Sequence, residues 1–166
     1  MSVKKLISSY AAFNLSANQQ FVNWLKSQPE ELLHKEIPSS FKGVLHTLNH
    51  IWAAEEVWCA DLFKNDDVVN RYYIHELNAQ EVFEGLLNRS EKILEQVNQL
   101  SEEDFDTSMN IEKPWYKAKL TLAEYLQHTF NHGTYHRGQI ITMGHTLGFK
   151  EMPSTDFLFY SIMKEG

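Results

Sequence analysis

The longest helical pattern in the chain runs from Leu122 to Leu147, and it sets the scale of any fold that contains it. Thr121, followed three residues later by Glu124, is typical of a capping box at a helix N-terminus. Gly148 stands where helices commonly end in a left-handed residue. A helix of about 26 residues is about 40 Å long at about 1.5 Å per residue. It is long enough to span a domain of this size.

Three further segments carry apolar residues three and four positions apart, the pattern of a helix with one apolar stripe. They run from Lys4 to Gln28, from Ser39 or Ser40 to about Phe63, and from Asn78 to about Leu100. Pro29 ends the first segment, serines can cap the second, and Asn78 with Glu81 three residues later has the outline of a capping box for the third. Four long amphipathic segments without a convincing strand pattern predict an all-α fold, a four-helix bundle.

The remaining segments are shorter and connect or cover the helices. Residues 101–120 lack a sustained helical period and favour an irregular crossover with a small hairpin between Phe105 and Tyr116. The tail after Pro153 carries apolar residues that predict a short helical cap. No linker or repeat interrupts the sequence, so we expect residues 1–166 to form a single domain.

Charge and apolar content exclude several kinds of partner. Fifteen basic and 22 acidic residues give a net charge of −7, so no basic field is available for nucleic acid. No stretch approaches the roughly 18 consecutive apolar residues that span a membrane, and the first 20 residues lack the apolar core of a signal peptide. The single cysteine, Cys59, cannot form an internal disulfide. We therefore expect a cytoplasmic protein with no membrane partner.

Histidine is the residue type with the least random spacing. The chain has eight histidines, and random placement predicts about 0.4 pairs separated by four residues, the spacing that puts two side chains on one helical face. The observed pairs are His46/His50, His128/His132 and His132/His136. This excess is the main indication of function.

His132 and His136 lie one turn apart on the predicted C-terminal helix, so their imidazoles can converge on one point. A third nitrogen has to come from a facing helix, and the second long helix offers His50, with His46 one turn earlier. Three neutral imidazoles on a divalent ion leave coordination positions for water, which is typical of a catalytic metal centre. The ligands do not select the metal: zinc is the default, nickel is a rival, and iron or manganese remain open.

These histidines also have structural interpretations. The His132/His136 pair lacks the glutamate that makes an HExxH pattern specific, so packed or solvent-facing histidines are an equal alternative. His128 and His46 continue the stripes one turn farther away, and we expect them to hydrogen-bond a neighbour rather than bind metal. The other histidines are expected at the surface: His34, His75 and His145.

Two carboxylates follow His50 along the same helix, Glu55 and Glu56. A carboxylate near a metal can orient a ligand or move a proton, which makes Glu55 a candidate catalytic residue. A solvated helix face is the favoured alternative for both. Cys59 lies nine residues past His50, about 180° around the helix, and is expected to point away from it. The four tryptophans are expected in the core: Trp24, Trp52, Trp58 and Trp115.

The sequence HTFNHGTYHRGQI, from His128 to Ile140, resembles the HxxxHRGQI signature of the DinB/YfiT-like family. LHTLNHIWAAEEVW, from Leu45 to Trp58, is similar to the second-helix segment of that family. FNLSAN resembles the first-helix motif Tyr-Asn-x-Trp-Ala-Asn, except that Ser16 replaces the tryptophan. Further similarity lies in the tail, at Gly148, Pro153, Asp156 and Tyr160.

The resemblance implies an up-down-down-up four-helix bundle whose metal ligands map onto His50, His132 and His136. It also implies a homodimer formed through helix faces and a small-molecule substrate. Relatives include thiol S-transferases that use low-molecular-weight thiols such as bacillithiol, and a mycothiol-dependent isomerase.

Three functions are compatible with these observations. The first is an enzyme whose metal ion binds a small thiol as thiolate and directs it onto an electrophile. The second is a metal-dependent hydrolase in which Glu55 moves a proton. The third is a damage-inducible stress protein that binds metal without turnover. For an enzyme with an apolar bundle core, we expect the metal-free protein to stay folded.

Overall fold

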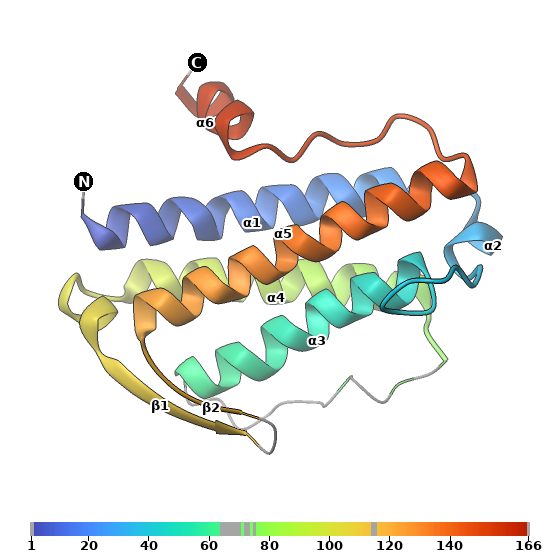
Figure 1. The fold of residues 1–166 in the computed structure, drawn as a ribbon. Helices are drawn as coiled ribbons and strands as arrows, with labels where there is room; N and C mark the ends of the chain where they lie inside the picture. The colour runs from blue at the N-terminus through green and yellow to red at the C-terminus, as the bar shows by residue number, and fades with distance from the viewer. Residues whose placement is uncertain (1, 64–70, 72–73, 75, 114–115, 166) are drawn as a thin grey trace.

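The computed structural model describes residues 2–63, 71, 74, 76–113 and 116–165. Figure 1 shows four long helices lying alongside one another, with a short hairpin across one end and a small C-terminal helix outside the bundle. In chain order the elements are α1 (Val3–Lys26), α2 (Glu30–Leu33), α3 (Val44–Phe63), α4 (Ala79–Gln99), η2 (Glu103–Asp106), β1 (Ser108–Lys113), β2 (Tyr116–Thr121), α5 (Leu122–Leu147) and α6 (Phe157–Glu165).

The four long helices form an up-down-down-up bundle. Helices α1 and α3 each pack against both α4 and α5. Figure 1 shows that α3 and α4 run in the same direction, opposite to α1 and α5. The predicted all-α bundle is confirmed, with one small two-stranded sheet added to it. No helix among the described residues is long and apolar enough to cross a membrane.

The ends of α4 and α5 lie where the capping residues predict them. The Asn78 side chain accepts a hydrogen bond from the backbone N–H of Glu81 at 2.9 Å. Thr121 and Glu124 form the reciprocal capping box, and Gly148 closes α5 with a φ of 76°. These ends are local features, because each depends on groups within four residues.

Helix α3 begins at Val44 and not at the predicted serine cap Ser40. The preceding loop folds back on itself, and the Ile37 N–H donates to the Lys42 carbonyl at 3.0 Å. Gly43 has a φ of 153°, and a Cβ at that position would lie 2.5 Å from a backbone oxygen of the loop. Only glycine fits there. The serines are thus free to line a pocket.

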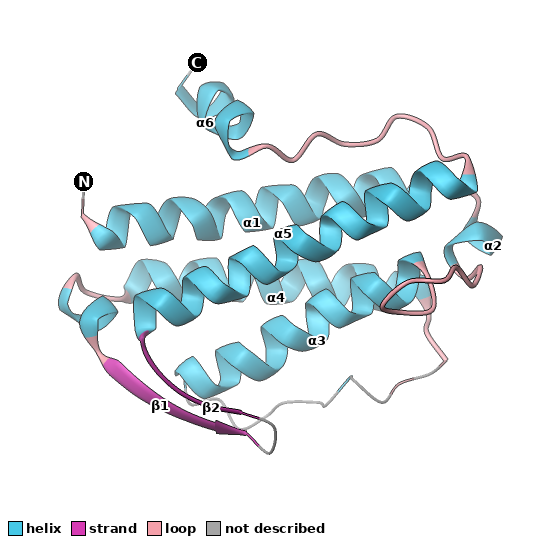
Figure 2. Cartoon of the chain, in the orientation of Figure 1, coloured by secondary structure: helices cyan, strands magenta, loops and turns pink. Residues whose placement is uncertain are grey.

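The predicted hairpin is present, although its strands extend closer to α5 than expected. Strands β1 and β2 pair antiparallel, from Ser108 opposite Thr121 to Lys113 opposite Tyr116. Phe105, in the short helix before the hairpin, is fully buried against the bundle. Figure 2 shows the two strands as the sole sheet among the described residues. The hairpin covers the end of the bundle where α5 begins.

The apolar core consists of two clusters separated by a polar layer. One cluster includes Phe21, Leu48, Leu86 and Ile140, and the other includes Ile7, Ile93, Tyr125 and Phe130. Between them, all four long helices contribute buried polar side chains. These residues are Asn14 and Asn18 of α1, Glu55 of α3, Arg89 and Ser90 of α4, and Arg137 of α5.

Glu55 and Arg137 are joined through two asparagines in this layer. The Glu55 carboxylate accepts hydrogen bonds from the side-chain amides of Asn14 at 2.8 Å and Asn18 at 3.3 Å, and from the Ser90 hydroxyl at 3.0 Å. The Arg137 guanidinium donates to the amide oxygens of Asn14 at 3.0 Å and Asn18 at 2.8 Å. The prediction that Glu55 lies on a solvated helix face is wrong, because its exposed fraction is 2%.

The tail forms the predicted helical cap, α6. Its Phe157 ring stacks on Tyr10 of α1 with centroids 4.6 Å apart, and it meets Phe13 edge-on. The outer face of α6 leaves apolar side chains exposed: Leu158, Phe159, Ile162 and Met163. The expected homodimer stays a prediction.

Candidate metal centre

Three histidines from two adjacent helices converge at one point. His50 lies on α3, and His132 and His136 lie one turn apart on α5. The Nε2 atom of His132 is 3.0 Å from Nε2 of His50 and 3.0 Å from Nε2 of His136. One nitrogen from each ring lies within 4.8 Å of the others. The structure therefore brings together the three residues that the sequence predicts as ligands.

Burial keeps these imidazoles in the neutral form. It lowers the pKa of His50 to about 4 and that of His132 to about 3, with a smaller contribution from the neighbouring histidines. Burial also lowers the pKa of His136. Neutral imidazole nitrogens are the donors that zinc, nickel and iron(II) accept. Three such nitrogens facing one point are a donor set that fits a divalent ion.

Aromatic rings cover the flanks of the three histidines. Phe41 stacks on His50 with ring centroids 4.1 Å apart. Trp58 and His132 pack in a T-shaped arrangement with ring centroids 4.6 Å apart. Trp58 is thus only partly in the core, and Phe41 is a site residue that the sequence analysis missed. Phe41 lies in a loop, where no periodicity marks it.

The other predicted histidines lie outside this group. His128 is exposed, and its ring centroid is 6.4 Å from that of His132. His46 lines the neighbouring pocket. His34 and His145 are exposed as predicted, and His75 lies outside the described residues, as does Trp115.

Neither Glu55 nor Cys59 is placed to act in the site. The Glu55 hydrogen bonds run to α1 and α4, into the polar layer described above. Cys59 is fully buried in the core cluster that contains Ile93 and Tyr125, and burial raises the pKa of its thiol to about 12. A thiol with that pKa is not a nucleophile at neutral pH.

A pocket of about 650 Å³ opens beside His50. Its lining consists of residues 36–42, His46, Asn49 and His50 on α3, and Ile74. This volume is in the range of small-molecule sites. The pocket therefore places a substrate-sized space against one of the three histidines.

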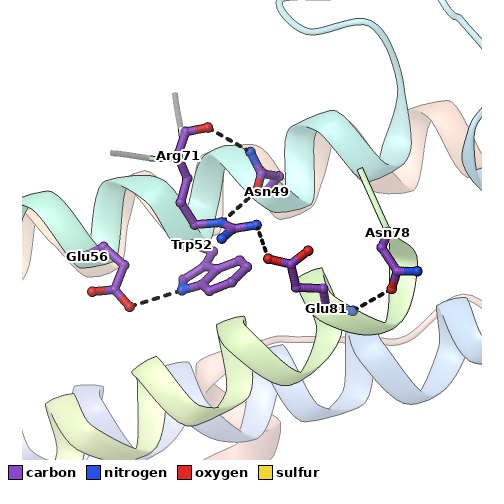
Figure 3. A network of polar contacts seen from close by, with 6 residues as sticks. All are labelled: Asn49, Trp52, Glu56, Arg71, Asn78 and Glu81. Carbon is purple, nitrogen blue, oxygen red and sulfur yellow. Dashed lines mark hydrogen bonds and ion pairs between the residues drawn. The ribbon is translucent and has the colours of Figure 1, made fainter. Parts of the chain in front are cut away.

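A polar network holds Arg71 against α3 and α4, next to this pocket (Figure 3). The Arg71 guanidinium lies 3.6 Å over the Trp52 ring and donates to Glu81 at 3.0 Å. It also donates to the side-chain oxygen of Asn49 at 3.3 Å, while the Asn49 amide donates to the Arg71 carbonyl. Glu56, also expected on a solvated face, is half-buried and accepts from the Trp52 indole at 3.1 Å. The network therefore holds the side chain of Asn49, the residue before His50 on α3.

Acid is expected to destabilise the metal-free protein through His50 and His132. Their pKa values fall from 6.5 to about 4 and about 3 on folding, so between pH 6.5 and pH 3 the unfolded chain binds more protons. Stability is therefore lost as the pH falls through this window. We expect the melting temperature in chelator to drop more between pH 7 and pH 5 for wild type than for the double variant His50→Gln/His132→Gln. Equal drops would contradict the burial of neutral histidines.

The chain is similar to known proteins over nearly its whole length. The DinB family profile matches residues 1–165. The protein named Protein DinB from Bacillus subtilis (strain 168) is 32% identical over 160 residues, which cover 91% of each chain. These matches include the helices that carry the three histidines. The chain therefore belongs to the DinB family, as its sequence motifs, its bundle and its histidine cluster together indicate.

Proposed function

We propose that this protein is a metal-dependent enzyme that transfers a small thiol to an electrophilic small molecule. His50, His132 and His136 would hold a divalent ion, zinc or nickel in the first instance. The observation that carries the proposal is the convergence of three Nε2 atoms, two pairs of them 3.0 Å apart. Such an ion keeps positions open and would stabilise a bound thiol as its thiolate.

Residues of the chain would bind and orient the two reactants, and a small-molecule thiol would supply the reacting sulfur. Cys59 is the single cysteine of the sequence, and it is sealed in the core with a pKa raised to about 12. A thiol reaction at this site therefore needs a low-molecular-weight thiol. The pocket beside His50 supplies space for it or for its acceptor, with Phe41 and Trp58 limiting access of water at the flanks.

The first test is metal content and turnover of the same preparation. We expect purified protein to carry or take up about one Zn²⁺ or Ni²⁺ per chain by elemental mass spectrometry. Metal-loaded protein should accelerate conjugation in a panel of thiols and electrophiles, and chelated protein should not. Reloading the chelated sample is the matched control, since it restores metal without changing the chain.

The outcomes separate the alternatives. Metal uptake with ester or amide hydrolysis but no thiol transfer would favour a hydrolase over the proposed reaction. Metal uptake with no turnover in either panel would favour a metal-binding stress protein. No uptake at all would leave the histidines as packing residues and overturn the proposal.

A further inference from the structure

Gln139 connects His136 to the loop that lines the pocket. Its side-chain oxygen lies 2.7 Å from Nδ1 of His136. Its side-chain amide nitrogen donates to the Ser40 hydroxyl at 3.3 Å. The next residue, Phe41, stacks on His50. The loop therefore contacts His50 and His136 directly through Phe41, and it holds the far side of the His136 ring through Ser40 and Gln139.

The hydrogen bond from His136 to Gln139 decides which ring nitrogen of His136 carries the proton. A neutral imidazole carries one N–H, and an amide oxygen can only accept. The proton therefore lies on Nδ1, and Nε2 keeps its lone pair toward His132. The opposite tautomer would present an N–H to the centre, where it cannot bind a cation.

We propose that Gln139 is a positioning residue for His136 and that the contact between Ser40 and Gln139 couples the metal site to the pocket loop, residues 36–42. This inference rests on the proposed function only in requiring that the three histidines bind a metal ion. Gln139 and Ser40 would set the orientation of His136, and the affinity for metal would depend on the position of the pocket loop.

The coupling works in both directions. If the loop position affects metal affinity, metal binding must order the loop by the same free energy. The loop contains a suitable reporter, because the Ile37 N–H donates to the Lys42 carbonyl at 3.0 Å across its base. Opening of the loop breaks this bond and exposes the amide to exchange.

The first experiment measures Zn²⁺ affinity and the Co²⁺ absorption spectrum of four variants against wild type. Gln139→Leu removes the acceptor, and we expect it to weaken Zn²⁺ binding about 10–100-fold and to change the Co²⁺ spectrum. Gln139→Glu restores an acceptor and should bind at least as tightly as wild type. Ser40→Ala should weaken binding less than Gln139→Leu does. Gln127→Leu, the same change at an exposed position of α5, should have no effect.

The second experiment follows hydrogen exchange in residues 36–42 with and without Zn²⁺. Added Zn²⁺ should protect this loop in wild type and protect it less in Ser40→Ala. Equal protection in both proteins would overturn the coupling. Wild-type affinity in Gln139→Leu, or equal weakening by Gln139→Leu and Gln139→Glu, would overturn the positioning role.

Failure of the inference and failure of the proposed function give different results. If wild type binds no Zn²⁺ or Co²⁺, the proposed function fails and the inference fails with it. If wild type binds metal and the variants of Gln139 behave alike, only the inference fails. Should Gln139→Leu not fold, the affinity of Gln139→Glu and the exchange of Ser40→Ala still decide the result.

Discussion

Replacing His132 by alanine is expected to weaken Zn²⁺ and Ni²⁺ binding by more than about 100-fold, beyond the loss typical of partners that only support a ligand. His132 is the central residue of the three, because its Nε2 lies 3.0 Å from the Nε2 atoms of both His50 and His136. Without His132, one candidate nitrogen remains on α3, from His50, and one on α5, from His136. Isothermal titration with each metal, on protein first stripped with chelator, measures the effect.

His128→Ala is the matched control for this variant. It removes the same side chain one turn earlier on α5, from an exposed position outside the group of three. We expect His128→Ala to bind metal as wild type does and the metal-free His132→Ala protein to stay folded by circular dichroism. Wild-type affinity in His132→Ala, or equal losses in both variants, would show that the ion binds elsewhere.

The second large effect concerns the buried layer in the middle of the bundle. Arg137→Met is expected to lower the free energy of unfolding by about 3–5 kcal/mol, because it removes the cation that Asn14 and Asn18 connect to the buried Glu55 carboxylate. Urea denaturation in the presence of chelator measures the change without a contribution from metal.

The pH dependence of the same variant identifies the cause. Burial raises the pKa of Glu55, while hydrogen bonds from Asn14 and Ser90 and the charge of Arg137 oppose the rise. Without Arg137 the folded pKa rises further above the unfolded value. The folded chain then binds more protons than the unfolded chain, so stability must fall as the pH rises.

Arg137→Met should therefore lose more stability at pH 8 than at pH 5. The double variant Glu55→Leu/Arg137→Met is expected to recover part of the loss, since the carboxylate and the guanidinium are removed together and the groups left behind, Asn14, Asn18 and Ser90, are neutral. A loss that is independent of pH, or a double variant that equals the sum of the single ones, would show that the two charges are not coupled.

Local features of the sequence predict the helix ends that depend on short-range hydrogen bonds. Asn78 and Thr121 cap α4 and α5 as expected, because each side chain needs only a backbone N–H three residues away. The start of α3 is not local in this sense. It depends on Gly43 and on a loop that folds back, so serine caps alone predict it too early.

The candidate site likewise has a part that local sequence predicts and a part that it does not. Helical periodicity places His132 and His136 on one face of α5, and spacing together with the family resemblance selects His50 on α3. The contacts that surround them come from parts of the chain without such a pattern. Ser40 and Phe41 lie in a loop far from α5 in the sequence, with Ser40 99 residues before Gln139, and only chain folding brings that loop to Gln139 and His136.

Helix phase, the capped helix ends and the excess of histidine pairs are properties of neighbouring residues, so the sequence by itself determined the bundle and the pairing of His132 with His136 on one face of α5. Burial depends on what the other helices place opposite a residue. Glu55 is one of two adjacent glutamates on α3, for which a solvated helix face is the ordinary expectation, yet Asn14 and Ser90 bond to it and the charge of Arg137 acts on it from the three other long helices. Only the tertiary structure could make it an interior carboxylate, because its hydrogen-bond partners are distant in the chain.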